Sequence, residues 1–305
     1  MVILIDIISL FFNNEHIIKK YEENIINLSN SKYNINFILV CNKSTDNTLK
    51  ELNKLKNKYS NVNVISTNSN GCSLGKNTGI INSRPDCEYL LFLDSDIIIN
   101  LLCIDEYINS ITSDIKYISY FGGNIDNKKY IGGTFLNNNI IINNINNMKY
   151  LGGGCSLICN KLVQSHKLLF DTYYDPFIMQ DVDFSFKVLS HAQIKNIKKN
   201  SNNVSHLGSY TINKFHKDFY QFQLLRNSLY IMNKYNIIKE DILHDLDNFI
   251  NNDIFILMKT TYKDYNYTPV NNINNTLLFT NNNYISFEAD YYFYNDVSNL
   301  DSLQD

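Results

Sequence analysis

The sequence predicts an α/β fold with a mixed, mainly parallel central sheet flanked by helices, followed by a C-terminal helical or irregular extension. The segment YLLFLDSDIIIN, residues 89–100, carries a continuous apolar run that ends in an Asp-Ser-Asp triplet. Such runs are typical of strands that are buried on both faces of a parallel sheet. Strand-like and helix-like patterns also alternate along residues 2–112. This alternation predicts parallel strands joined by right-handed helical crossovers.

The elements of the first part follow from their hydrophobic patterns. Continuous apolar runs predict strands at residues 2–12, 35–41, 62–67 and 89–93. Apolar residues at three- and four-residue spacings predict helices from Glu15, after a cap at Asp46, within the glycine-marked segment 68–83 and at about 100–112. The N-terminal run contains Asp6 and lacks a basic region, which favours a core strand over a signal peptide.

After Lys116 the pattern changes, and turns rich in glycine and asparagine predict hairpins. The expected strands lie in KYISYFGG, KKYIGGTFL and IIINN, and a glycine turn precedes an apolar segment in GGGCSLIC. Helices are expected at residues 160–170, 181–190, 218–235 and 239–260, with strand-like segments at LLFT and YISFEADYYFY. The sheet is therefore expected to be mixed rather than wholly parallel.

Composition narrows the class of protein. The 305 residues suit one large domain, or one domain with an appendage, and the net charge of −3 provides no basic footprint for nucleic acid. The six cysteines show no paired CxxC spacing, which predicts buried free thiols in a reducing, cytoplasmic compartment. No apolar run approaches the roughly 18 residues of a membrane span. We therefore expect no transmembrane segment and no nucleic-acid partner.

Asp94 and Asp96 follow the fourth predicted strand. The carboxyl ends of strands in an open α/β sheet form the rim where ligands bind. Carboxylates there need a cation or a water-filled cleft, because an uncompensated buried charge is costly. A hard divalent ion that also holds substrate phosphates would satisfy them. The structural alternative is that Asp96 caps the next helix.

A second acidic pair, Asp181 and Asp183, lies in QDVDFSFKV. A carboxylate in a cleft can take a proton from an attacking hydroxyl. Taken alone, the pattern fits better with an N-cap and first-turn acid of a helix. His206 follows a short predicted strand and could be one more metal ligand, although a lone histidine is usually a satisfied core or surface residue.

A glycine-marked turn carries a cation near the start of a predicted helix. Gly71, Gly75 and Gly79 surround Lys76 and Asn77, but their spacing fits neither GxGxxG nor the P-loop. Glycines allow close backbone approach, and a cation at a helix start suits a diphosphate. An ordinary strand–helix turn is an equal alternative.

Taken together, these segments resemble glycosyltransferase family 2, whose members are inverting enzymes with the GT-A, Rossmann-like fold. The resemblance covers about residues 2–235. IDIISLFFNNE resembles the family's first strand and T-Y-N turn, with Phe11 and Phe12 where Thr and Tyr are usual. VCNKSTDNT resembles D-N-x-S-x-D-G-T, with Cys41 replacing the Asp that contacts the base. GCSLGKNTG resembles G-x-x-x-x-R-N-x-G, with Lys76 for Arg.

The later motifs keep the family's order. LFLDSD matches its Asp-x-Asp, and GGGCSLICNK resembles the Gly-Gly segment that lines the acceptor side. QDVDFSFKV resembles E-D-x-D-F-S-x-R, with Gln180 for Glu and Lys187 for Arg. NVSHLGS resembles a V-x-H segment, and LLRNSLYIMNKY resembles a later R-N helix. Chance matches do not keep order and spacing, so the resemblance favours Asp181 as the base.

The resemblance implies roles for named residues. It implies that Asp181 is the catalytic base and that Asp94, Asp96 and His206 hold Mn²⁺ or Mg²⁺. It implies donor contacts at Phe11, Asn13, Asn42, Asp46, Gly71, Lys76, Asn77, Asp94 and Ser95, and acceptor-side contacts at Gly153, Gly154 and Asp183. Residues 1–115 would bind the nucleotide-sugar, 116–235 would form the acceptor-binding and catalytic half, and 236–305 would be a C-terminal extension.

The implied reaction is a metal-dependent, inverting transfer of a hexose in glycan biosynthesis. The donor would be a nucleotide-sugar, with UDP favoured by family frequency, and the acceptor a hydroxyl of a glycan or protein. Three alternatives stay open. One is a catalytically inactive GT-A-like binding module, which Cys41 and Gln180 favour. The others are a retaining transferase and a nucleotidyltransferase of similar fold, although SLFFNNEH lacks the latter's glycine-rich basic loop.

Overall fold

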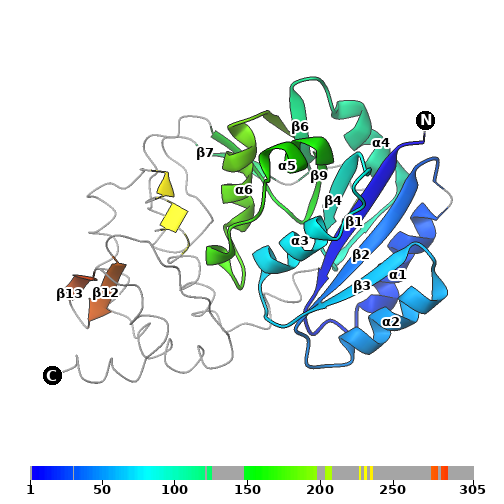
Figure 1. Ribbon diagram of the computed structural model, residues 1–305, viewed down its shortest axis with the longest axis horizontal. Coiled ribbons are helices and arrows are strands. Elements are labelled where there is room, and N and C mark those ends of the chain that lie inside the picture. The colour runs from blue at the N-terminus through cyan, green and yellow to red at the C-terminus, as the bar shows by residue number, and fades with distance from the viewer. Residues whose placement is uncertain are drawn as a thin grey trace. The chain divides into compact units, whose positions relative to one another are not determined.

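A seven-stranded mixed sheet forms the centre of one compact unit, which comprises Met1–Gly123, Lys149–Asp171 and Gln180–Lys214 (Figure 1). The computed structural model describes residues 2–29, 31–120, 122–125, 148–197, 203–207, 276–280 and 283–287, together with residues 227, 230, 231, 234 and 235. The sheet order is β10-β6-β9-β4-β1-β2-β3. The sheet is parallel except for β9, which runs antiparallel to both β4 and β6. The predicted mixed, mainly parallel fold is confirmed.

The strands of this sheet are short apolar segments. They are β1 (Leu4–Phe11), β2 (Asn34–Asn42), β3 (Val62–Thr67), β4 (Tyr89–Leu93), β6 (Ile115–Ser119), β9 (Cys155–Cys159) and β10 (Gln193–Asn196). Alternate residues of β1 enter different cores, with Ile5 and Ile7 on one face and Ile8 on the other. This period of two is what a strand buried on both faces requires.

Helices cover both faces of the sheet. They are α1 (Ile18–Leu28), α2 (Thr48–Lys58), α3 (Cys72–Ile81), α4 (Leu101–Ser110), α5 (Asn160–His166) and α6 (Gln180–Leu189). Side chains of α1, α2 and α4 join the core on one face, and those of α3, α5 and α6 border the core on the other. Figure 1 shows α1 and α2 on one side of β1–β3 and α3 on the other.

Several elements depart from their predicted bounds for local reasons. The helix expected at 160–170 ends at His166, because Lys167 adopts a left-handed conformation with φ of 50°. The first strand expected after Lys116 is β6, which pairs with β9 and β10 rather than forming a hairpin. The remaining hairpin strands, expected within residues 126–147, lie outside the described residues.

The helix after Asp96 does not use that aspartate as its cap. A short strand, β5 (Ile97–Ile99), follows Asp96 directly. The side chain of Asn100 then caps α4 by accepting from the backbone N–H of Cys103. The capping alternative for Asp96 is therefore wrong. β5 pairs instead with the antiparallel strand β11 (Val204–His206).

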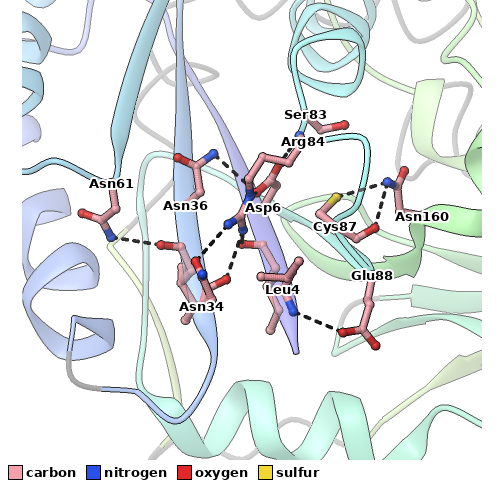
Figure 2. Close-up of polar contacts among 12 residues, drawn as sticks. Leu4, Asp6, Asn34, Asn36, Asn61, Ser83, Arg84, Cys87, Glu88 and Asn160 are labelled. Atoms are coloured by element: carbon pink, nitrogen blue, oxygen red, sulfur yellow. Dashed lines mark hydrogen bonds and ion pairs between the residues drawn. The ribbon is translucent and has the colours of Figure 1, made fainter. Parts of the chain in front are cut away.

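A polar network around the buried Asp6 lies at the amino ends of β1 and β2 (Figure 2). The carboxylate of Asp6 is fully buried and accepts from the backbone N–H of Arg84 (2.6 Å) and from its Nε (2.7 Å). The guanidinium also donates to the side chain and backbone of Asn34. Since Arg84 follows α3, the network joins the segment that precedes β4 to the start of the sheet.

A second compact unit contains Asn124–Met148, Thr172–Met179 and Phe215–Asp305. Within it, Thr172–Tyr174 forms a 3₁₀ turn, and Asn227 donates from its amide to the carbonyls of Phe177 (3.0 Å) and Ile178 (2.8 Å). Residues 227, 230, 231 and 234 are helical, in agreement with the helix predicted at 218–235. The helix predicted at 239–260 lies outside the described residues.

The remaining strands are short. β7 (Gly122–Ile125) and β8 (Met148–Leu151) form a two-stranded sheet. β12 (Thr276–Thr280) and β13 (Asn283–Phe287) form an antiparallel pair in the second unit, in the segments LLFT and YISFEADYYFY that were predicted as strand-like. Residues 288–294 of the second segment lie outside the described residues. Among the residues placed by the structure, no helix has the length and apolar character needed to cross a bilayer. The functional division expected from the sequence, into a nucleotide-sugar-binding segment (1–115), an acceptor-binding and catalytic segment (116–235) and a C-terminal extension (236–305), remains a prediction.

Candidate active site

The carboxyl end of β4 brings Asp94 to the rim of the sheet. The backbone N–H of Asp94 donates to the carbonyl of Gly154 (2.7 Å), so the end of β4 is tied to the glycine turn that precedes β9. In β4, Leu90 and Phe92 face the core bordered by α3, α5 and α6. By strand alternation Asp94 belongs to this side of the sheet.

Asp181 lies in the first turn of α6 and pairs with Lys76 of α3. Its Oδ1 is 2.7 Å from the Nζ of Lys76, across 105 residues of sequence. The ammonium is buried, whereas the side chain of Asp181 keeps 23% of its surface exposed. The helix-terminus alternative is confirmed in part: Asp181 and Asp183 both lie in the first turn of α6, but Asp181 is inside the helix and is not its N-cap. One residue can serve both roles.

Two consecutive glycines separate the carboxylates of Asp181 and Asp94. A Cβ on Gly153 would lie 2.2 Å from Oδ1 of Asp181 and 2.4 Å from Nζ of Lys76. A Cβ on Gly154 would lie 3.1 Å from Oδ2 of Asp94. Both carboxylates therefore approach the same backbone turn, and any side chain at residue 153 would enter the ion pair.

Charge and burial shift the pKa values in this cluster. Burial raises the pKa of Asp94 to about 7; the Lys76 ammonium opposes the shift, whereas Asp96 and Asp181 add to it. For Lys76, burial acts to lower the pKa, but the negative charges of Asp181 and Asp94 outweigh it and the pKa is raised. One buried cation thus compensates neighbouring carboxylates.

Asp96 and His206 meet through the β5–β11 ladder. His206 pairs in register with Ile97, and the backbone N–H of Leu207 donates to the carbonyl of Asp96 (2.8 Å). This ladder leaves Nε2 of His206 3.4 Å from Oδ2 of Asp96. Two adjacent ligands of one octahedral ion, each at about 2.1 Å from it, are roughly 3 Å apart. Carboxylate and imidazole donors suit Mn²⁺, so this pair fits a divalent ion.

The donor set is incomplete without a substrate. Across the described parts of the chain, no three histidine, cysteine or acidic side chains form a group that could hold a metal ion. Ions that act on nucleotides are commonly held by one or two carboxylates, with substrate phosphates and waters completing the shell. Asp96 and His206, with Asp94 nearby in sequence, match that pattern.

Asn13 and Asp46, which were predicted to contact the donor, make hydrogen bonds that hold the loops after β1 and β2. Asn13 has a left-handed backbone, and its Oδ1 accepts from the backbone N–H of Thr45 (2.8 Å). The carboxylate of Asp46 accepts from the N–H groups of Thr48 (3.0 Å) and Glu15 (3.3 Å), but the N-cap residue of α2 is Asn47, so the cap predicted at Asp46 is wrong by one residue. These side chains give the two loops a fixed geometry.

Asn42 and Asn77 also make internal bonds. The side chain of Asn42 is buried; it donates to the carbonyl of Gly71 (3.0 Å) and accepts from that residue's N–H (3.3 Å). Asn77 exchanges two hydrogen bonds of 2.8 Å with the backbone of Phe170. Asn42 thus fixes the turn before α3, and Asn77 fixes the segment after α5. Their predicted contacts with the donor remain a prediction.

The other predicted site residues differ in exposure. The ring of Phe11 is fully buried and packs edge-on against Tyr21, so a donor contact by this ring would require the core to open. Asp183 is fully buried, and its Oδ2 lies 3.1 Å from the Nζ of Lys187 on the next turn of α6. Ser95 is buried and accepts from Asn14 (2.9 Å). Phe11, Asp183 and Ser95 are thus buried, whereas Asp181 and His206 keep part of their side chains exposed.

Sequence reasoning did not identify Asn14 or Phe170. Asn14 joins the loop after β1 to the Asp94–Asp96 segment through Ser95. Phe170 places its ring 4.9 Å from the Nζ of Lys76. Asn14 stands within the motif IDIISLFFNNE, which could have drawn attention to it, whereas nothing in the local sequence of Phe170 indicates its position.

The comparison with family models decides the family. The model of Glycosyl transferase family 2 matches residues 6–161, just over half of the chain. The chain belongs to glycosyl transferase family 2. The resemblance inferred from the motifs is thereby confirmed, and this family match includes Lys76, Asp94, Asp96 and both site glycines.

Individual relatives match this family 2 chain over a short segment or at low sequence identity. A poly(ribitol-phosphate) beta-glucosyltransferase of Bacillus spizizenii is 37% identical over 94 residues, which is 30% of this chain and only 14% of that enzyme. A mannosyltransferase of Pyrobaculum calidifontis was solved with GDP-Man and Mn²⁺. Its structure has a TM-score of 0.53 at 11% identity, and the match covers 84% of this chain and 75% of the mannosyltransferase chain. This structural likeness supports a GT-A-like fold.

A third comparison is weaker. Residues 1–349 of S. aureus TarS, solved with UDP, give a TM-score of 0.45 at 18% identity over 87% of this chain and 76% of that one.

Proposed function

We propose that this chain is a metal-dependent, inverting glycosyltransferase that moves a sugar from a nucleoside-diphosphate donor to a hydroxyl of a glycan or protein acceptor. Membership of glycosyl transferase family 2 supports the transferase class. The observation that carries the proposal is the meeting of Asp94 and Asp181 at the consecutive glycines Gly153 and Gly154. A donor-side carboxylate and a base candidate from distant parts of the chain thus share one backbone turn.

Asp181 is the proposed base. Its side chain is partly exposed, and Oδ1 is held by Lys76, so the second oxygen has a fixed position. In the reaction, the acceptor hydroxyl gives its proton to Asp181 while its oxygen forms a bond to the anomeric carbon. The bond from that carbon to the diphosphate oxygen breaks, and the electron pair leaves with the nucleotide. Attack opposite the leaving group inverts the anomeric configuration, and the protein forms no covalent intermediate.

Asp96 and His206 are the proposed ligands of Mn²⁺ or Mg²⁺, with Asp94 completing the acidic cluster. When bound, the ion supplies positive charge next to the leaving diphosphate. Mn²⁺ is the first ion to test, because Asp96 and His206 offer oxygen and nitrogen donors and the mannosyltransferase of similar fold was solved with it.

The donor is proposed to be a UDP-sugar. Among transferases of family 2, UDP is the most frequent carrier, and the Bacillus relative is by name a glucosyltransferase. The fixed loops around Asn13, Asp46 and Asn42 provide the rigid rim on which a nucleotide would rest. UDP-glucose is therefore the first donor to offer.

A nucleotide screen tests the proposal on the full chain. Thermal stability is measured with UDP, GDP, UDP-glucose and GDP-mannose, each with Mn²⁺ and with EDTA, because a ligand that binds the native state raises the Tm by mass action. Release of the nucleoside diphosphate is then followed, and the product anomer is assigned by NMR. We expect stabilisation by a UDP compound that requires Mn²⁺, with slow release of UDP.

Other outcomes identify the alternatives. Stabilisation without any release, with a range of sugar acceptors present, would support an inactive binding module. Pyrophosphate formation from a nucleoside triphosphate and a sugar 1-phosphate would indicate a nucleotidyltransferase. A product with the donor's own anomeric configuration would indicate a retaining enzyme and would reject the inverting role of Asp181.

A further inference from the structure

Lys76 occupies an unusual position for a residue expected to contact a diphosphate. Its ammonium is buried, and its ion pair is with Asp181 at 2.7 Å. We propose that Lys76 is a positioning residue for Asp181, holding Oδ1 so that Oδ2 takes the acceptor proton, and that it is not a ligand of the donor diphosphate. This inference rests on the proposed function, because Asp181 needs a fixed orientation only if it acts as a base.

Two aromatic rings lie near the ammonium. The Nζ of Lys76 lies 4.9 Å from the ring centre of Phe170 and 6.0 Å from that of Phe92. Cation–π attraction of this kind is stronger where water is excluded. The rings and the carboxylate together define one place for the charge.

The wall of this pocket is itself anchored. Asn77, the next residue after Lys76, exchanges two 2.8 Å hydrogen bonds with the backbone of Phe170. The ring of Phe170 stacks on Phe184 at 4.1 Å, and Phe184 lies on α6, the helix that carries Asp181. The cation, its aromatic wall and the carboxylate therefore move as one packed assembly rather than as a flexible arm.

The backbone at Gly153 approaches the ion pair closely. A Cβ there would lie 2.4 Å from Nζ of Lys76 and 2.2 Å from Oδ1 of Asp181, so the backbone already touches both partners. The second oxygen of Asp181 has no hydrogen bond to any residue that the structure describes. This asymmetry between Oδ1 and Oδ2 is what a carboxylate oriented for proton transfer requires.

In the step itself, the proton of the acceptor O–H passes to Oδ2 of Asp181 as the oxygen bonds to the anomeric carbon. The carbon–diphosphate bond breaks with its electron pair leaving on the nucleotide. Lys76 exchanges no proton and forms no bond. Its charge also offsets the repulsion between Asp181 and Asp94, the carboxylates that it faces.

The test separates a positioning role from a diphosphate contact. UDP affinity is measured by calorimetry with Mn²⁺, and kcat by UDP release from UDP-glucose, for Lys76→Met, Lys76→Arg and Asp181→Asn. We expect Lys76→Met to lower kcat by about 100-fold or more. We expect it to leave the Kd of UDP within about threefold of the wild type, a change below 0.7 kcal/mol on the scale of roughly 1.4 kcal/mol for each tenfold step. Lys76→Arg should recover part of the lost kcat.

Lys58→Met is the matched control. Lys58 forms an ion pair of the same length, 2.7 Å, with Glu22 on the surface formed by α1 and α2. It should change neither kcat nor the Kd of UDP. The positioning role is overturned if Lys76→Met weakens UDP binding more than about tenfold while kcat at saturating donor is kept, since that is the signature of a donor contact.

A second measurement needs no activity. The Tm is compared for Lys76→Met, Asp181→Asn and the double variant in the absence of nucleotide. Asp181→Asn leaves a buried ammonium without its counter-ion, so we expect the double variant to have a higher Tm than Asp181→Asn alone. Additive Tm losses would overturn the Lys76 role even in an active enzyme. A wild type that binds no nucleotide and releases none overturns the proposed function instead.

Discussion

The Nε2 atom of His206 lies 3.4 Å from Oδ2 of Asp96, although 110 positions separate the two residues in sequence. The contact is made by the β5–β11 ladder, which pairs His206 with Ile97, the residue after Asp96. Backbone pairing therefore presets the distance between an imidazole and a carboxylate. A pair held in this way loses little conformational freedom when an ion binds both donors.

Removing either donor should weaken cation binding. We expect Asp96→Asn and His206→Ala each to weaken Mn²⁺ binding in the presence of UDP by at least about tenfold, because mutation even of groups that only support a ligand typically costs 10–100-fold. Free Mn²⁺ is measured by electron paramagnetic resonance in a titration. His191→Ala is the control, since His191 is exposed and stacks on His166 at 3.8 Å. Unchanged Mn²⁺ affinity in both site variants would remove these residues from the metal site.

Two glycine-to-alanine changes should affect different properties: Gly153→Ala mainly the activity, and Gly79→Ala mainly the stability. In Gly153→Ala the new Cβ would meet only side-chain ends, at 2.2 Å from Asp181 and 2.4 Å from Lys76. Because no backbone atom is met, the protein should still fold, but the ion pair is parted. We expect a fall of at least about 100-fold in UDP release, in line with losing a positioned base, and a Tm loss no larger than that of Asp181→Asn, which also deprives the buried ammonium of this carboxylate.

Gly79→Ala is the matched change in the core. Its Cβ would lie 2.2 Å from Cγ2 of Ile8, where α3 packs on β1. Overpacking of this kind costs about 1–3 kcal/mol of unfolding free energy. We expect a lower Tm with nearly normal UDP release at temperatures where the variant is folded. If both variants lose stability and activity in the same proportion, the distinction between site glycine and packing glycine fails.

An exposed ion pair gives a pH prediction. Hydrogen bonds from Lys58 and Tyr59 hold the pKa of Glu22 below its usual value. A lowered folded pKa adds stability above the unfolded pKa, and this stability is lost as the pH falls through the folded pKa. Glu22→Gln should therefore cost up to about 1 kcal/mol at pH 7, as for other surface pairs. Urea denaturation should show that difference shrinking below about pH 4. A difference that is constant from pH 7 to pH 3 would contradict the assignment.

Much of the fold was predictable because its signals are local. The strand at residues 62–67 was predicted with the bounds that β3 has, and the helix within 68–83 is α3. Each depends on a hydrophobic period that is set within one element. The position of Asp94 at the end of a buried strand followed from the same reasoning.

The antiparallel insertion of β9 between β4 and β6 had no local signal. The segment Cys155–Cys159 reads as an apolar run whatever its direction, and its partners are chosen by tertiary packing. The sequence also carried no signal for the direction in which polar side chains point. Asn42 and Asn77 have the residue type and position of ligand contacts, yet their amides bind Gly71 and Phe170 in the folded chain. Sequence reasoning could name these residues as candidates but could not predict the direction of their amides.

The partnership of Asp6 with Arg84 illustrates the same limit and gives the last prediction. Asp6 was visible as a charge in an apolar strand, but nothing in the spacing identified an arginine 78 residues later as its partner. Because the carboxylate is fully buried, removing the guanidinium leaves a charge without compensation. We expect Arg84→Met to cost about 3–5 kcal/mol of unfolding free energy.

Replacing both partners should cost much less. In Asp6→Leu with Arg84→Met, no buried charge remains, and apolar replacement of a buried pair is often close to neutral. Urea denaturation with constant m-values would measure the three variants. The network lies at the amino ends of β1 and β2, whereas Asp94 follows the carboxyl end of β4, so UDP release by the double variant should stay near wild type. A double variant as unstable as Arg84→Met would mean that the hydrogen bonds of Arg84 to Ile5 and Asn34, and not its charge, stabilise this edge of the sheet.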